Sequence, residues 1–311
     1  MSTEKNTENT NATPCKTAKP VVKKRKRRLG DRHDGYKVRN LDLPFYIIPV
    51  VMRTRLDSQV FFNISIDIDD IEKYVREKRR SDIPNLKLLH VVMAAALRMF
   101  ATRPQLNRFV AGKKIYAHND ISFSMSIKRN LTDDGEETEV CPVFERTDTL
   151  YDVVKKFNGE VEKAFADEET DTDKLNRIVG MTPTCIKSFI VFVLRNLDKV
   201  GLMPKFITKA SPFHASAYIT DVGSLGIDSI YHHLYEFGTC SCFIAMGKKQ
   251  TIPCIKDDGT LGQKKVINFR FVLDERITDG HYYAASLRKF TRYMKHPELL
   301  ELPPEELPDE I

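Results

Sequence analysis

The stretch Val266–Gly280, VINFRFVLDERITDG, runs from an apolar strand pattern through charged residues into the start of a helix. Its first eight residues are rich in Val, Ile and Phe, which favours a strand. The remaining seven, Asp274–Gly280, include four charged residues. Charges at such a junction form either a helix cap or a functional site. Asp279 before Gly280 is a good N-cap, and caps are far commoner than sites.

The residues around this stretch predict a long hairpin followed by the last helix. A partner strand is expected over Thr239–Gly247, joined to Val266–Leu273 through a turn-rich connection over Lys256–Gln263. The final helix is expected over Gly280–Lys295. The partner strand contains Cys240-Ser241-Cys242, a pair without further ligands at metal-site spacing. Core packing of the two thiols is therefore favoured, and no metal site is predicted.

Helix and strand patterns alternate along the rest of the chain. The alternation indicates an α/β or α+β layered domain with a mixed sheet. We expect Lys114–His118 and Ile121–Lys128 to pair with each other. Strands are predicted over Phe45–Arg53, Gln59–Ile68, Lys114–His118, Ile121–Lys128 and Ala215–Asp221. Helices are predicted over 69–80, Leu86–Arg103, Thr149–Ala166 and Leu175–Lys199, the last of them interrupted at Pro183.

The charge of the chain is concentrated at its two ends. The 311 residues include 49 basic and 43 acidic ones, a formal net charge of +6. Residues 1–32 hold ten bases and three acids (+7), residues 298–311 hold six acids and no base (−6), and residues 33–297 net +5. We therefore expect a disordered basic leader over 1–32, a domain over 33–297 and an acidic tail over 298–311. The small excess of charge in the domain does not require nucleic acid as a partner.

Composition excludes several classes of protein. Hydrophobic residues make up 41% and charged residues 30%, which is ordinary for a globular chain. No run of 18 apolar residues is present, so we expect neither a spanning helix nor a membrane partner. The N-terminal residues lack an apolar signal segment, and six cysteines in this length make no disulfide framework. A cytoplasmic location is the expectation.

A second informative segment, Thr220–Gly226 (TDVGSLG), takes a predicted strand into glycines. Glycine allows a ligand to approach the backbone closely, and a neighbouring hydroxyl can donate a hydrogen bond to it. Taken alone, the segment is also an ordinary exit from a strand into a turn.

Together the two segments resemble the catalytic domain of the dihydrolipoamide acyltransferases of 2-oxo acid dehydrogenase complexes, and more distantly chloramphenicol acetyltransferase. The family's DHRxxDG signature corresponds to Asp274–Gly280, and its strand exit SNLGxxG corresponds to Thr220–Gly226. Arg103–Ile127 is similar to the PxLN segment and its following hairpin. Cys141–Val143, followed by the Thr149–Ala166 helix, is similar to the family's VPVI stretch and helix. Order and spacing agree across the predicted domain.

The resemblance implies a two-layer α/β (α+β sandwich) fold, like that of chloramphenicol acetyltransferase, with a mixed sheet packed by helices. It implies a homotrimer or larger cage with active sites between subunits, where coenzyme A or a lipoyl thiol enters. Thr220 replaces the family's Ser and keeps the hydroxyl that stabilises the oxyanion. Gly223, Ser224 and Gly226 would border the coenzyme A thioester, which serves as co-substrate. Asp279 would keep a structural, charge-paired role.

One departure from the family pattern concerns the catalytic base. Glu275 stands where the family has its catalytic His. A glutamate has an ordinary pKa of about 4.3, against about 6.5 for histidine and about 8.5 for a thiol, so it is a much weaker base unless it is buried. His281 follows Gly280 and is a candidate replacement. His214 and His232-His233 are further candidates, although a structural or surface role is more common for such residues.

Three functions of different classes remain open on the sequence. The first is an acyltransferase that uses a thioester, with Thr220 at the oxyanion and Glu275 or a recruited histidine as base. The second is a catalytically silent family member that acts as a trimeric scaffold or ligand-binding module. The third and least favoured is a nucleic-acid binder that acts through the basic leader, which contains KKRKRR over Lys23–Arg28.

Overall fold

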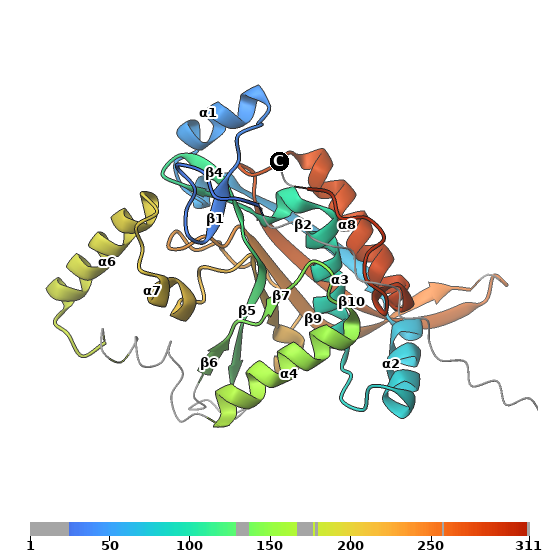
Figure 1. Ribbon diagram of the computed structural model, residues 1–311. Coiled ribbons are helices and arrows are strands. Elements are labelled where there is room, and N and C mark those ends of the chain that lie inside the picture. Colours follow the sequence, from blue (N-terminus) through green and yellow to red (C-terminus); the bar gives the residue numbers. More distant parts are fainter. Residues whose placement is uncertain (1–24, 129–136, 167–176, 178–179, 257, 310–311) are drawn as a thin grey trace, which may run out of the picture.

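A mixed sheet forms the centre of the molecule (Figure 1). The computed structural model describes residues 25–128, 137–166, 177, 180–256 and 258–309. In spatial order the strands are β2 (Gln59–Asp67), β10 (Leu261–Asp274), β9 (Cys242–Ile255), β8 (Ala217–Asp221), β5 (Ile121–Lys128) and β6 (Glu137–Val140), with β7 (Val143–Phe144) also on β5. Strand β8 is parallel to both of its neighbours, and the other pairs are antiparallel. The predicted mixed sheet is confirmed.

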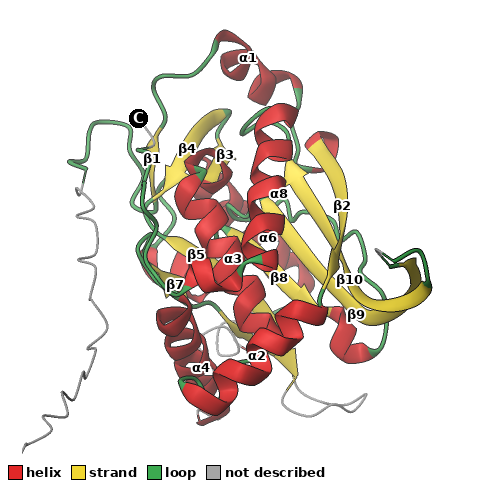
Figure 2. Cartoon of the chain, turned by 90° about the vertical axis from the view of Figure 1, so that its right-hand side faces the viewer, coloured by secondary structure: helices red, strands yellow, loops and turns green. Residues whose placement is uncertain are grey.

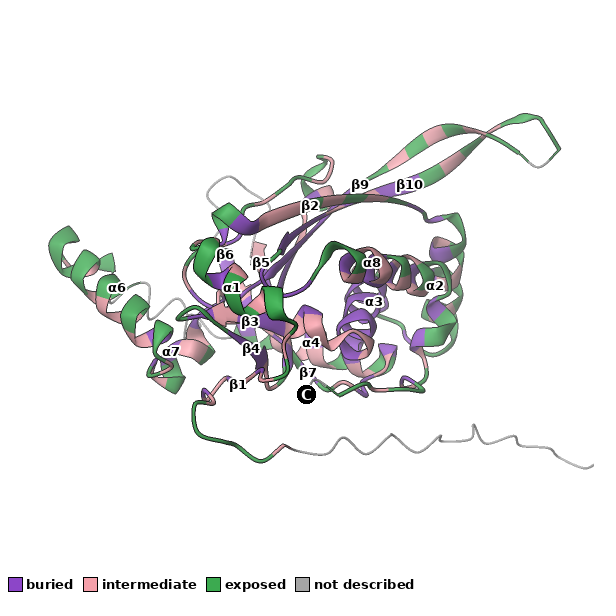
Figure 3. Cartoon of the chain, turned by 90° about the horizontal axis from the view of Figure 1, so that it is seen from above, coloured by how far each residue is buried: buried purple, intermediate pink, exposed green. Residues whose placement is uncertain are grey.

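One face of this sheet is covered by helices, as Figures 2 and 3 show. Alternate residues of β10 divide between the two faces. Phe269 and Phe271 belong to the main core under the helices, whereas Val272 belongs to a smaller cluster on the opposite face. The two-layer architecture expected from the sequence is therefore present. The covering helices are α2 (Asp69–Ser81), α3 (Leu88–Thr102), α4 (Leu150–Ala166) and α8 (Gly280–Lys295).

The central helix of this layer, α3, is buried on nearly all sides. Its sequence LLHVVMAAALRMFAT has no continuous polar face, which is the pattern of a helix enclosed by other elements. It packs against α8 and α4 as well as the sheet. The helices predicted over 69–80, Leu86–Arg103, Thr149–Ala166 and Gly280–Lys295 are all confirmed within a few residues.

The predicted pairing of Lys114–His118 with Ile121–Lys128 is wrong. Both segments are strands, but β4 (Lys114–His118) pairs with β3 (Arg108–Ala111) and β1 (Gly35–Lys37) in a separate three-stranded sheet. The turn between β3 and β4 explains this choice. Gly112 and Lys113 both have positive φ, the conformation of a tight two-residue hairpin turn.

The strand predicted over Phe45–Arg53 is also wrong, because these residues form helix α1 (Leu43–Val51). Its apolar, partly β-branched sequence LPFYIIPVV resembles a strand, but Pro44 lies in the first turn, where proline favours a helix start. Leu43 and Ile47 are strongly exposed, whereas Phe45 packs against a small buried cluster, so α1 contributes little to the core of the chain.

Strands β9 and β10 are longer than predicted. Strand β2 pairs only with Val266–Asp274 of β10. Beyond that point the two strands continue as a ribbon that projects from the body (Figure 3). The connection predicted over Lys256–Gln263 is therefore shorter than expected, because β9 ends at Ile255 and β10 begins at Leu261, at the end of the ribbon.

A second projecting part is formed by α6 (Thr184–Lys199) and α7 (Lys205–Ala210), on the side of the molecule away from the ribbon (Figure 1). Half of the helix predicted before Pro183, residues 175, 176, 178 and 179, lies outside the described residues. At the other end of the chain, Leu300 is buried and Glu301 accepts hydrogen bonds from Tyr74 and Lys78, both at 2.8 Å. Among the described helices, none has the length and apolar content needed to cross a bilayer.

Candidate functional site

The charged junction after β10 is held by a buried ion pair. The guanidinium of Arg276 donates to both carboxylate oxygens of Asp274, at 2.8 Å from Nε and 2.7 Å from Nη2. The hydroxyl of Ser58 donates to the same carboxylate at 2.9 Å. The Tyr283 hydroxyl donates to the Asp274 carbonyl at 2.6 Å. Because Asp274 is fully buried, the donors from Arg276 and Ser58 on its carboxylate are what make its charge tolerable.

A second buried guanidinium, that of Arg55, lies next to this pair. Its Nε is 4.0 Å from the Asp274 carboxylate, and its Nη2 donates to the carbonyl of Gly238 at 2.7 Å. Burial lowers the pKa of Arg55, Asp274 opposes that shift, and the positive charge of Arg276 adds to it. Arg55 therefore ties the loop before β2 to the segment before β9.

Glu275 lies on the outside of this braced turn. Its backbone N–H donates to the Ser58 carbonyl at 2.8 Å, so its main chain is fixed while its side chain is exposed. The neighbouring Arg276 is committed to Asp274. This chain alone does not bury Glu275, although burial was the expected means of strengthening a carboxylate base. A covering surface would have to come from another molecule.

Asp279 and His281 lie at the start of α8. The Asp279 carboxylate accepts from the backbone N–H of Tyr282 at 2.8 Å, which makes it the N-cap of the helix. The cap predicted from the sequence is confirmed. His281 is exposed in the first turn of the helix, and its proposed catalytic role stays a prediction.

The second segment leaves the sheet at the end of β8. Thr220 is half-buried, and the following residues form a short 3-10 turn. A side chain on Gly223 would come within 2.5 Å of the Gly247 carbonyl oxygen, and Gly226 has φ +78°. Both glycines are thus explained by the backbone alone. Ser224 donates its hydroxyl to the Asp221 carbonyl at 2.7 Å.

Within one chain, Thr220 and Glu275 lie far apart. Thr220 is in register with Ala245 on β9, which is in register with Arg270 on β10. Glu275 lies five residues beyond Arg270. With a rise of about 3.3 Å per residue and a strand spacing of about 4.8 Å, the two backbones are on the order of 20 Å apart. One chain therefore cannot bring both side chains to the same reacting atom.

A histidine lies on the same face of the sheet as Thr220. The ring of His232 stacks on Phe243 at 4.2 Å, and Phe243 is the register partner of Tyr218, two residues before Thr220. Burial lowers the pKa of His232. The histidine pair His232-His233 thus lies on the face of the sheet that carries Thr220, with the His233 ring stacked on that of His232 at 4.7 Å.

His214 has a structural environment instead. Its ring is buried, with Nδ1 at 2.8 Å from the Ser211 hydroxyl and Nε2 at 3.6 Å from the Asp198 carboxylate. These contacts attach the end of α6 to the segment before β8.

A segment that the sequence did not indicate covers part of the open sheet face. Residues 227–238 cross the sheet, with Tyr231 against Phe61 and Tyr235 against Tyr218. The sequence IYHHLYEF over 230–237 is unusually aromatic for a connection, and this was the signal that it covers an apolar surface. The supporting residues Arg55 and Ser58 carry no such signal.

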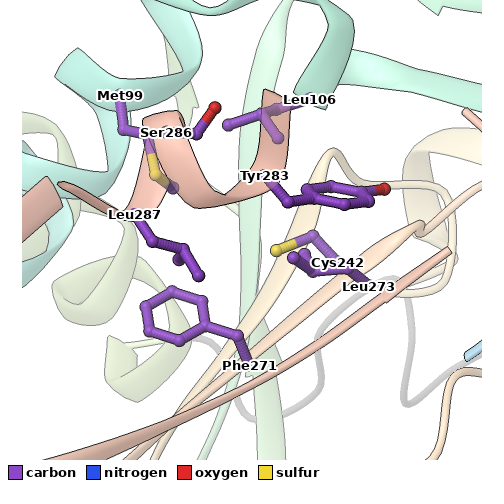
Figure 4. Close-up of a pocket in the computed structure, with 8 residues that line it drawn as sticks. All are labelled: Met99, Leu106, Cys242, Phe271, Leu273, Tyr283, Ser286 and Leu287. Carbon is purple, nitrogen blue, oxygen red and sulfur yellow. The ribbon is translucent and has the colours of Figure 1, made fainter. Parts of the chain in front are cut away.

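The two close cysteines are both buried, Cys242 as the first residue of β9 and Cys240 in the segment just before it. Cys242 belongs to the main core and Cys240 to the cluster on the other face, as the core-packing interpretation expects. Cys242 also borders a small apolar cavity between the sheet, α3 and α8 (Figure 4), lined by Met99, Leu106, Cys242, Phe271, Leu273, Tyr283, Ser286 and Leu287. Its volume of about 10 Å³ is near the minimum for one water, so it is no substrate site.

Residues 212–302 match the family model described as 2-oxoacid dehydrogenases acyltransferase (catalytic domain). This range includes both the Thr220 turn and the Asp274–Gly280 junction. Over these residues, which make up less than half of the chain, the sequence is similar to that catalytic domain. The family resemblance drawn from the sequence is confirmed.

Several solved structures of this acyltransferase family and its relatives are similar to the chain. A probable dihydrolipoamide acetyltransferase from Listeria monocytogenes has 14% identity and a TM-score of 0.47, covering 83% of this chain and 94% of its own. The dihydrolipoamide acetyltransferase of Azotobacter vinelandii has 12% identity and a TM-score of 0.49, covering 86% and 95%. A chloramphenicol acetyltransferase has 10% identity and a TM-score of 0.49, covering 82% and 96%. Among curated proteins, none matches the chain.

Proposed function

We propose that this acyltransferase-family chain moves an acyl group between a thioester and an acceptor, at a site built between two copies of the chain. The observation that carries the proposal is the separation of Thr220 and Glu275, on the order of 20 Å within one chain by strand register. Both residues lie within the matched range, in the two segments that resemble the family's signatures. A site that uses both of them requires Thr220 from one copy and Glu275 from the next.

The proposed reaction needs two groups from the protein, a base and a donor to the oxyanion. The acceptor's thiol or hydroxyl attacks the thioester carbonyl while a base takes its proton, and a tetrahedral oxyanion forms. The Thr220 hydroxyl donates a hydrogen bond to that oxyanion. When the intermediate collapses, the carbon–sulfur bond breaks and the leaving thiolate takes the proton back. Glu275, covered by the neighbouring copy, is the proposed base.

A homotrimer with coenzyme A or a lipoyl group as the thiol carrier is the proposed form of this site. The exposed position of Glu275 supports an arrangement in which a second copy covers it. Ser224 and the turn glycines Gly223 and Gly226 are proposed to border the carrier. A cytoplasmic location is proposed because the described cysteines are free thiols, which suits a reducing compartment.

The experiment measures thiol release from acyl-coenzyme A by the full chain. Thr220→Ala should lower kcat by about 10²–10³-fold, the usual loss when one oxyanion donor is removed, while Thr220→Ser retains most activity. Glu275→Ala should lower it by about 10²-fold or more, and Glu275→His should retain or raise it.

Mixing the two inactive variants tests the site between copies. If Thr220→Ala and Glu275→Ala chains are unfolded together and refolded as mixed trimers, about one quarter of the interfaces combine an intact Thr220 with an intact Glu275. About that fraction of activity should return. Separate refolding followed by mixing is the control. No recovery in mixed trimers would contradict a shared site.

A catalytically silent scaffold is the second candidate, and the exposed glutamate at the histidine position favours it. It predicts a trimer with no turnover of any acyl-coenzyme A tried, and no change in Glu275→Ala. Turnover that falls in both single variants would exclude it.

A further inference from the structure

Helix α6 exposes apolar side chains that no part of the described chain covers. Phe189 and Phe192 are 67% and 65% exposed, and Ile186 is 46% exposed. Their spacing of three residues places them along one side of the helix. The next connection and α7 add three more exposed apolar residues, Val200, Leu202 and Phe206, which are 67–69% exposed. We call these six residues the α6 apolar surface.

The polar side of α6 and its neighbours is basic. Residues 180–210 contain Lys187, Arg195, Lys199, Lys205 and Lys209 and a single acid, Asp198. Asp198 is buried and paired with Arg32 at 2.6 Å, so its charge is neutralised. The helix therefore combines an apolar side, which includes two phenylalanines, with an exposed basic side.

Among the described residues, the contacts that hold the helix to the body lie near its C-terminal end. Asp198 holds Arg32 there, and the carbonyl of Lys199 packs directly against Gly112. The rest of α6 stands away from the body (Figure 3). This geometry presents the apolar surface outward as a unit.

The contacts of Arg32 also bring the described residues 25–33 to this place. His33 lies 3.1 Å from the Thr208 hydroxyl of α7, and the Arg27 guanidinium donates to the His33 carbonyl at 2.7 Å. Lys26 and Arg28 are exposed beside it. Residues 25–33 thus lie beside the α6–α7 unit, with exposed basic side chains near its apolar residues.

We propose that the α6 apolar surface, together with Lys26–Arg28, docks this protein on an anionic lipid surface. An amphipathic helix with phenylalanines on one side and Lys/Arg on the other lies in the plane of a membrane interface, and a polybasic cluster supplies the second signal that stable binding needs. Helix α6 has 16 residues and is about 24 Å long, too short to span the bilayer. A protein partner is disfavoured because lysine is depleted at protein interfaces. The sequence led us to expect no membrane partner, and this proposal differs from that expectation.

The test is sedimentation of the full chain with vesicles of phosphatidylcholine containing phosphatidylserine, and with vesicles of phosphatidylcholine alone. Binding to the anionic vesicles is expected, with little binding to the neutral ones. Phe189→Ser/Phe192→Ser should weaken that binding by about tenfold or more. Lys26→Gln/Arg28→Gln should weaken it at low salt and much less at high salt.

The projecting ribbon supplies a matched control. Ile255 and Leu261 are 76% and 84% exposed and face each other across the ribbon, on the opposite side of the molecule from α6 (Figure 1). Ile255→Ser/Leu261→Ser should bind vesicles as the unchanged protein does. Circular dichroism of each variant checks that the chain is folded.

Three results would overturn the proposal. They are no sedimentation with anionic vesicles, equal binding by the Phe189→Ser/Phe192→Ser variant, or a smaller assembly of that variant by light scattering without lipid. The last result would show that the α6 apolar surface is an interface between copies. Acyl transfer, measured in parallel, is expected to be unchanged in all these variants, so the outcome does not depend on the proposed site.

Discussion

Asp274 and Arg276 form a buried ion pair only two residues apart, in which one guanidinium binds both oxygens of one carboxylate at 2.7 and 2.8 Å. Glu275 lies between them with its side chain directed to the surface. Successive side chains therefore alternate between the two sides of the turn: Asp274 and Arg276 point inward, and Glu275 points outward. The ion pair acts as the support that fixes where Glu275 is presented.

Replacing Arg276 by alanine should lower the free energy of unfolding by about 3–5 kcal/mol, because Asp274 would remain buried without its partner. Urea unfolding measures this loss. Arg276→Lys keeps the charge but not the two-point geometry, so we expect an intermediate loss. A loss below about 1 kcal/mol for Arg276→Ala would show that the pair does not hold the turn.

Asp279→Ala should lower the free energy of unfolding by about 1 kcal/mol, since the N-cap bond to the Tyr282 N–H is removed. Asp279→Ser keeps an acceptor at the cap. Its free energy of unfolding should therefore lie within a few tenths of a kcal/mol of that of the unchanged protein. Thermal unfolding of both variants provides the comparison. If Asp279→Ser loses acyl transfer while keeping its stability, the carboxylate has a role beyond the cap.

Much of the fold follows from hydrophobic periodicity. Helix α3 and strand β2 are long and regular, and their positions could be predicted to within a few residues. Helix α1 could not, because an exposed helix made of Phe, Ile and Val has the composition of a strand and no core pattern to correct it. The partner of β4 could not be predicted either, since it depends on a two-residue turn with positive φ at Gly112 and Lys113.

The site shows the same limit. The strand–helix junction and the cap at Asp279 follow from local sequence, and both were predictable. Arg55 and Ser58 were not, because they reach Asp274 across more than 200 residues of chain and carry no local pattern. The separation of Thr220 from Glu275 is likewise a property of strand register, which only the assembled sheet reveals.

Alanine substitutions at Gly223 and Gly226, the glycines that follow β8, should show whether each glycine is needed for backbone packing or for contact with a ligand. Gly223→Ala would place a methyl group 2.5 Å from the Gly247 carbonyl oxygen, so we expect a loss of about 1–3 kcal/mol in the free energy of unfolding. Gly226→Ala, at φ +78° in open space, should cost about 1 kcal/mol. Gly280→Ala has open space and begins a helix, so it is the neutral control.

These three variants are compared by urea unfolding and by the Michaelis constant for acyl-coenzyme A. If Gly226→Ala raises that constant while its stability falls only as expected, the turn borders the substrate. An unchanged constant would leave Gly226 with a purely conformational role.

His90 makes the stability of the fold depend on pH. Its Nδ1 accepts the backbone N–H of Lys87 at 3.0 Å at the start of α3, and its ring packs against Phe157. Burial lowers the pKa of His90 to about 4, and the charge of Lys87 adds to the shift. The folded state therefore holds the neutral ring, whereas the unfolded chain binds a proton near the ordinary pKa of about 6.5.

The contribution of His90 to the free energy of unfolding is fully present above about pH 6.5, and it is lost as the pH falls towards about 4. By about pH 5 the loss amounts to about 2 kcal/mol. His90→Gln keeps a side-chain acceptor at the same helix position, as in a capping box, but does not titrate. Its unfolding free energy should therefore decrease less than that of the unchanged protein between about pH 7 and pH 5. Parallel decreases in urea titrations of the two proteins would show that His90 is not the titrating group.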